Sequence, residues 1–228
     1  MKQKKTESQE SLKRLYQCEY SVISKDRKMH LEEIRKYAKT YPYDNIDRIS
    51  KDYLETNILF LTVGLRNQKT LHDQVLFLMR HEERTHSWVI TDTTKKLLIH
   101  SRLKEDIMDV DVLLSSNREY LIRYGYLFLM DAISEENLPL ILSRFQNRSD
   151  YYAMMVQAWL LSVIAVIYFN DVLLFLKESN LSYTLKSHTI SKILDSYRIT
   201  KEEKEEIRKY RKELNRHETD KDGLGCIA

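Results

Sequence analysis

Glycine and proline are scarce in this chain: its 228 residues include only 4 glycines and 2 prolines. Tight turns between strands depend on these two residue types, whereas helix interiors exclude them. The scarcity therefore predicts a wholly helical, all-α protein. Hydrophobic residues make up 43% of the sequence and charged residues 31%, which is typical of a folded globular protein rather than a disordered one.

Apolar residues recur at helical spacing along most of the chain. The pattern predicts helices over about 8–23, 31–39, 52–66, 71–82, 87–99, 104–114, 118–132, 137–145, 151–168, 170–178, 183–197 and 201–214. Two helix starts carry capping chemistry: Pro139 falls in an early turn, and Thr200 and Glu203 form a capping box. Most connections are short, so we expect consecutive helices to pack as antiparallel pairs.

Short helices without intervening strands are typical of a bundle or of a solenoid of stacked helix pairs. The sequence has no clean repeat period and no change of composition that would mark a linker. We therefore expect one helical domain over residues 8–214. A frayed segment, residues 1–7, would precede it, and a disordered polar tail, residues 215–228, would follow it.

Charge, cysteine content and apolar runs predict the cellular compartment of the protein. The net charge of +3 arises from 37 basic and 34 acidic residues, so a basic surface must come from their arrangement rather than their number. Cys18 and Cys226 lie near opposite ends, which fits a reducing compartment. The start of the chain is polar, and the apolar run 156–169 is shorter than the about 20 residues that span a bilayer. We expect no signal peptide, no membrane span and a cytoplasmic location.

Four residues in three predicted helices could carry chemistry. Trp88 and Asp92 lie one helical turn apart, which places an indole and a carboxylate on one helix face. Arg123 stands in an otherwise apolar helix, and Trp159 lies within a long apolar run. Taken singly, the tryptophans are core residues and Asp92 is a surface acid. Arg123 is then either a structural ion-pair partner, with Asp92 as one candidate for the pairing, or a phosphate ligand.

In their order along the chain these segments resemble the AlkD-type family of DNA alkylation repair proteins. Ser87 to Asp92 is similar to that family's SWxxxD segment, Leu121–Gly125 to its arginine segment, and Tyr151–Trp159 to its YYVxMxxAW segment. Residues 186–192 and 195–200 resemble the NKTIQK and ESYRI stretches of its short Firmicute-type members. The likeness covers about residues 31–214. An early R-T-P-x-L-R segment of the family is matched here only at Arg35.

The resemblance implies a HEAT-like α-solenoid of stacked antiparallel helix pairs, curved around a concave DNA-binding face. It implies a DNA glycosylase that hydrolyses the N-glycosidic bond of cationic alkylated purines, of the 3-methyladenine and 7-methylguanine type, with no metal and no organic cofactor. The partner would be double-stranded DNA carrying alkylated bases. The protein would be a monomer, cytoplasmic in a bacterium and active at the nucleoid.

Site roles follow from the resemblance residue by residue. Asp92 would be the catalytic carboxylate beside the anomeric carbon, because a fixed carboxylate stabilises an oxocarbenium ion and can deprotonate water. Trp88 and Trp159 would pack against the deoxyribose and backbone, and indole faces also stabilise cations. Arg123 would hold the flanking phosphate. Further candidates for the DNA groove, each equally an ordinary surface charge, are Lys186, Lys192 and Arg198.

Two other functions remain open at this point. The chain could be a catalytically silent relative that recognises DNA shape through phosphate contacts, or a protein-interaction α-solenoid whose concave face binds a peptide. The sequence contains no HExxH motif, no Cys/His ligand spacing and no Gly-rich phosphate loop. These absences argue against a metal site and against nucleotide-dependent activity.

Overall fold

The computed structural model describes the backbone of residues 23–224 and the side chains of residues 31–216. Within that range every regular element is a helix, which confirms the all-α prediction. The chain divides into two compact units, Met1–Tyr124 and Gly125–Ala228. The boundary falls inside a helix, and no linker-like composition marks it in the sequence. The expected frayed segment 1–7, the whole of the first predicted helix, 8–23, and both cysteines lie outside the described side chains.

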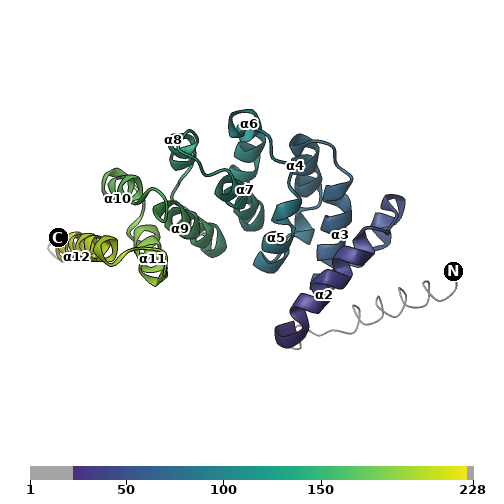
Figure 1. Cartoon of the computed structure of the whole chain (residues 1–228), viewed down its shortest axis with the longest axis horizontal. Coiled ribbons are helices and arrows are strands. Elements are labelled where there is room, and N and C mark those ends of the chain that lie inside the picture. Colours follow the sequence, from purple (N-terminus) through teal and green to yellow (C-terminus); the bar gives the residue numbers. More distant parts are fainter. Residues whose placement is uncertain (1–22, 225–228) are drawn as a thin grey trace. The chain divides into compact units, whose positions relative to one another are not determined.

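Unit 1 is built around one buried helix, α3 (Leu54–Arg66), whose residues from Glu55 to Leu65 are all buried. A helix that is apolar around most of its circumference is stable only when neighbours surround it. Helices α2, α4 and α5 all contact it (Figure 1). The other elements of the unit are α2 (Ile23–Ala38), η2 (Tyr43–Arg48), α4 (Leu71–Arg80), η3 (Glu82–Arg84), α5 (Trp88–Thr94), η4 (Lys95–Leu97), α6 (Leu103–Leu114) and the first part of α7 (Glu119–Asp131).

Unit 2 is organised around α9 (Tyr151–Ala165), which packs against α10 (Phe169–Glu178) and α11 (Tyr183–Asp195) (Figure 1). Most of α9 is buried, so the most apolar run of the sequence is a core helix, as predicted. The short helix α8 (Leu138–Leu142) precedes α9, and α12 (Lys201–Leu224) packs on α11. Among the described helices, none combines the length and the apolar character that crossing a bilayer requires.

The start of α12 shows the predicted capping box. The backbone N–H of Glu203 donates to Oγ1 of Thr200 at 3.2 Å, and the backbone N–H of Thr200 donates to Oε2 of Glu203 at 2.9 Å. These bonds satisfy two backbone donors that the first helical turn leaves without partners. The helix continues beyond its expected end at Leu214 to Leu224.

Candidate functional site

Helix α5 carries Trp88 and Asp92 on its partly exposed face. Ser87 caps the helix, since its Oγ accepts a hydrogen bond from the backbone N–H of Val89 at 3.2 Å. The intervening side chains Val89, Ile90 and Thr91 are buried, and α5 packs against α3. Trp88 is 37% exposed and Asp92 is half-buried one turn later. The indole and the carboxylate therefore share the partly exposed face of this helix.

Asp92 is held by Arg123 through a bidentate ion pair within unit 1. Nε of Arg123 donates to Oδ1 of Asp92, and Nη2 donates to Oδ2, both at 2.9 Å. Parallel bonds of this kind are charge-assisted and fix both groups in one plane. The ion-pair partner that the sequence offered for Arg123 is confirmed. Both oxygens of the candidate catalytic carboxylate accept bonds from one guanidinium.

A buried hydroxyl pair fastens α7 to α5 beside this ion pair. The hydroxyl of Thr94 donates to the carbonyl of Ile90 at 2.8 Å and is also hydrogen-bonded to the hydroxyl of Tyr124. Because the bond to Ile90 uses the single hydroxyl hydrogen of Thr94, the hydroxyl of Tyr124 is the donor in the bond between the two hydroxyls. Burial raises the pKa of Tyr124 well above its usual range, and the negative charge of Asp92 adds to that shift. The arrangement fixes Tyr124 and its neighbour Arg123 against the helix that carries Asp92.

The other four predicted site residues lie in unit 2. Trp159 is half-buried in α9. Lys186 is buried, with only 8% of its surface exposed, and its ammonium donates to the carbonyl of Ser179 at 2.7 Å. Lys192 is half-buried and Arg198 is exposed. Of the seven predicted residues, Trp88, Asp92 and Arg123 are therefore brought together in unit 1, while Lys186 is engaged inside unit 2.

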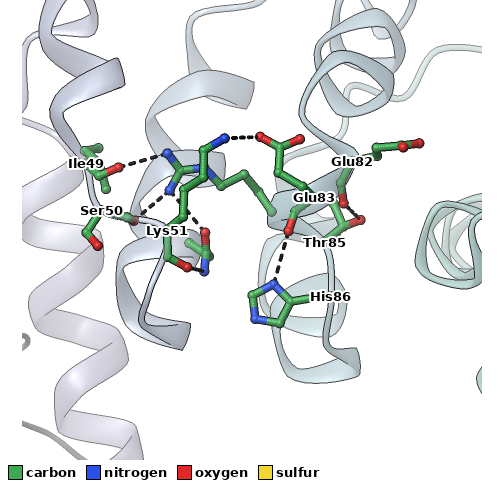
Figure 2. Close-up of polar contacts among 9 residues, drawn as sticks. Ile49, Ser50, Lys51, Glu82, Glu83, Thr85 and His86 are labelled. Atoms are coloured by element: carbon green, nitrogen blue, oxygen red, sulfur yellow. Dashed lines mark hydrogen bonds and ion pairs between the residues drawn. The ribbon is translucent and has the colours of Figure 1, made fainter.

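A second polar cluster in unit 1 centres on Arg84, which the sequence analysis did not single out. Arg84 is 2% exposed, and its guanidinium lies 4.1 Å from the centroid of the Phe60 ring. Nη1 donates to the carbonyl of Ser50 at 2.7 Å and to Oδ1 of Asn57 at 3.1 Å, and Nη2 donates to the carbonyl of Ile49 at 2.8 Å (Figure 2). Arg84 thus joins the segment before α3, α3 itself and the turn that leads into α5.

Electrostatics around Arg84 differ from those around Arg123. Desolvation lowers the pKa of the Arg84 guanidinium, and the nearby charges of Glu83, Asp47 and Asp52 oppose that effect. No carboxylate pairs with it among the described residues, since Glu83 instead accepts a bond of 2.9 Å from Lys51 (Figure 2). In the sequence Arg84 stands in a run of charged residues that looks like a solvated turn, so no local signal distinguishes it. Its contacts make it a structural anchor of unit 1.

Among the described residues, no group of three or more His, Cys, Asp or Glu side chains is placed to hold a metal ion. Comparison of the chain with protein-family models, with curated proteins and with solved structures finds no match. What the site does must therefore be inferred from the positions and charges of Trp88, Asp92 and Arg123.

Proposed function

We propose that this chain is a DNA glycosylase of the AlkD type, which hydrolyses the N-glycosidic bond of cationic alkylated purines in double-stranded DNA. The observation that carries the proposal is the carboxylate of Asp92, fixed by Arg123 and lying one helical turn from the partly exposed indole of Trp88. A fixed carboxylate next to an aromatic face is suited to stabilising a cation that forms beside it.

Cleavage of the N-glycosidic bond of a cationic purine needs few groups beyond a carboxylate and an aromatic face. Alkylation at N3 or N7 gives the purine a positive charge. When the bond between N9 and C1′ breaks, its electrons stay on the base, which becomes neutral, and the positive charge moves to the sugar as an oxocarbenium ion. Asp92 would stabilise that ion and take the proton that the attacking water loses as it adds to C1′. A base that leaves as a neutral molecule needs no general acid.

We assign the remaining roles in unit 1 to Arg123 and Trp88. Arg123 would act as a positioning residue, because its two bonds hold the carboxylate in one orientation. Trp88 would pack against the deoxyribose of the lesion. The contact of Arg123 with the flanking phosphate, expected from the resemblance, stays a prediction.

In unit 2, Trp159 is assigned to the same task as Trp88 on the resemblance alone, and Lys192 and Arg198 to phosphates. Lys186 is left out of the proposed DNA contacts because its ammonium is buried against the carbonyl of Ser179. The proposal includes a HEAT-like solenoid with a concave DNA-binding face. It also includes a monomeric protein that works on the bacterial nucleoid.

Release of free base from methylated DNA tests the proposal directly. Duplex DNA treated with a methylating agent is incubated with the protein, and free 3-methyladenine and 7-methylguanine are measured by chromatography. The wild type should release them, and Asp92→Asn should be slower by about a hundredfold or more. Asp109→Asn is the matched control, because Asp109 is paired with His72 elsewhere in unit 1. Catalysis is excluded if the wild type releases no more base than Asp92→Asn.

The same ion pair favours one second candidate, a DNA-binding protein without catalysis. Arg123 occupies both oxygens of Asp92, and such a pair would serve to hold the fold rather than to activate water. In that case the protein binds undamaged duplex DNA with strong dependence on salt and releases no base. Trp88→Ala would weaken binding, whereas Asp109→Asn would not.

A further inference from the structure

The turn 81–84 follows α4 and begins with His81, whose half-buried imidazole lies against two aromatic rings. The centroid of the imidazole is 4.9 Å from that of Phe60 in α3 and 4.7 Å from that of Phe77 in α4. The guanidinium of Arg84 stands 4.1 Å from the centroid of the same Phe60 ring. The imidazole is therefore part of an aromatic cluster that already holds one cation.

The next three residues join this cluster to other parts of unit 1. Nε of Arg118, the residue before α7, donates to Oε1 of Glu82 at 2.9 Å. Glu83 accepts a bond of 2.9 Å from Lys51 (Figure 2), and Arg84 donates to two backbone carbonyls just before α3. The turn thus connects α4 with the segment before α3 and with the start of α7.

The same turn leads directly into α5. The hydroxyl of Thr85 donates to the carbonyl of Glu82 at 2.7 Å. Nδ1 of His86 lies 3.3 Å from the carbonyl of Glu83 (Figure 2). Trp88, the first residue of α5, comes two residues after His86. Because the segment between them is short and hydrogen-bonded to the turn, a displacement of the turn would move the start of α5.

At neutral pH the imidazole of His81 is uncharged. Desolvation lowers the pKa of this group. The charge of Glu83 opposes that effect, whereas the cations Arg80 and Arg84 add to it. The charge of Asp47 in η2 acts in the same direction as that of Glu83. These charges face the imidazole from α4, from the turn and from η2, and on the side of α3 it meets an aromatic ring. The neutral imidazole therefore packs as one more ring of the cluster.

A proton on His81 changes this balance. A cation loses more by burial than a neutral ring, and the guanidinium of Arg84 on the same cluster repels it. The imidazole stands at the C-terminal end of α4, where the helix dipole and the last carbonyl groups favour a positive charge. The protonated ring is therefore drawn away from the aromatic rings, toward the helix end and water.

We propose that His81 is an acid-sensitive switch. Its protonation withdraws the imidazole from Phe60 and Phe77, loosens the turn 81–84 and displaces the start of α5 with Trp88. The switch is independent of the proposed function, because it moves Trp88 whether or not the protein acts on DNA.

The pH range of the switch follows from the direction of the pKa shift of His81. As the pH falls below about 6.5, the ordinary pKa of histidine, the unfolded chain takes up the proton before the folded chain does. Stability is therefore lost as the pH falls from there through the folded pKa. Desolvation raises the pKa of Glu83, but the bond from Lys51 contributes to a net lowering, so this pair stays ionised above about pH 5.

The fluorescence of Trp88 tests the switch in the full chain. Trp159→Phe leaves Trp88 as the only tryptophan, and its emission is followed from about pH 8 to about pH 5. We expect a change with a midpoint below about 6.5 that is absent in His81→Phe, which keeps a ring but binds no proton. His81→Gln is a second neutral variant, in case the larger ring disturbs the packing. Relative to His81→Phe, the unfolding constant of the wild type in urea should rise by up to about tenfold per pH unit.

His86→Gln is the matched control, because His86 lies two residues before Trp88 and could quench its emission directly. Loss of the change in both variants of His81, with its retention in His86→Gln, supports the switch. The switch is overturned if the emission does not change, if either variant of His81 keeps the change, or if His86→Gln removes it. A midpoint of His81 at or above about 6.5, read from its ring protons by NMR, would overturn it as well.

Discussion

Arg123 lies deeper in unit 1 than the carboxylate it holds: its side chain is 7% exposed, and that of Asp92 is 25% exposed. The two residues are therefore not equivalent partners. Without Asp92 the buried guanidinium would lose the carboxylate that neutralises its charge, whereas without Arg123 the carboxylate can still reach water. The stability of unit 1 should depend more on the acid than on the base.

Replacement of each partner tests this asymmetry. Asp92→Ala should lower the free energy of unfolding by about 1 to 3 kcal/mol, because the buried guanidinium loses the acceptor of two charge-assisted hydrogen bonds. Arg123→Met should cost less, because methionine fills the same apolar space and needs no partner. Urea unfolding followed by circular dichroism measures both, and the double variant should lose less than the sum of the two. A larger loss for Arg123→Met than for Asp92→Ala would contradict the asymmetry.

Local sequence patterns predicted much of this structure. The scarcity of glycine and proline indicated the all-α fold, and the pattern of Thr200 and Glu203 predicted the capping box that the structure contains. The pairing of Arg123 with Asp92 is one of the interpretations that the sequence leaves open, because an arginine in an apolar helix needs an acceptor. These features depend on residues that are close together in the sequence, or on the need of a charged side chain for a hydrogen-bond partner.

Features that depend on backbone acceptors were not predictable in this way. Arg84 and Lys186 are buried because backbone carbonyl groups of Ile49, Ser50 and Ser179 accept hydrogen bonds from their side chains. The position of a backbone carbonyl has no signature in the sequence. The predicted helix 87–99 also differs, since α5 ends at Thr94 and a 3-10 turn follows. The hydroxyl of Thr94 bonds back to the carbonyl of Ile90, a contact that bends helices and competes with their continuation.

Gly64→Ala should destabilise unit 1 although alanine is the better helix former. A β-carbon at Gly64 would lie 1.9 Å from Cζ of Phe77. The ring cannot easily move, because it stacks on Phe60 with centroids 5.6 Å apart and lies against His81 at 4.7 Å. Overpacking of this kind costs about 1 to 3 kcal/mol, which outweighs a gain in helix propensity of about 1 kcal/mol.

Thermal unfolding of Gly64→Ala checks the sign of the effect. Phe77→Leu shortens the side chain that the new methyl group meets, so the loss caused by Gly64→Ala should be smaller in a Phe77→Leu background. An unchanged or raised melting temperature for Gly64→Ala alone would show that Phe77 can move aside.

Arg84→Lys should be strongly destabilising even though it keeps the charge. A lysine ammonium is a single point and cannot reach the carbonyls of Ile49 and Ser50 while stacking on Phe60. We expect a loss of about 3 kcal/mol, since a buried charge then lacks its acceptors. Lys51→Gln is the matched control, because it breaks the exposed pair with Glu83 and should cost less than about 1 kcal/mol (Figure 2). Equal losses in the two variants would contradict the role assigned to Arg84.

The buried hydroxyl of Tyr124 should make the fold sensitive to alkaline pH. Its pKa is raised by burial and by Asp92, so above about pH 10 the unfolded chain loses this proton while the folded chain keeps it. The folded state then binds more protons than the unfolded state, and stability falls as pH rises, by about 1.4 kcal/mol per pH unit for each such tyrosine.

Tyr124→Phe should be less stable at neutral pH, because the bond to Thr94 is lost, yet show a shallower decline above pH 10. Tyr197→Phe is the control, since Tyr197 is 93% exposed and should leave the decline unchanged. Urea unfolding at a series of pH values measures these slopes, and identical slopes for Tyr124→Phe and wild type would refute the assignment.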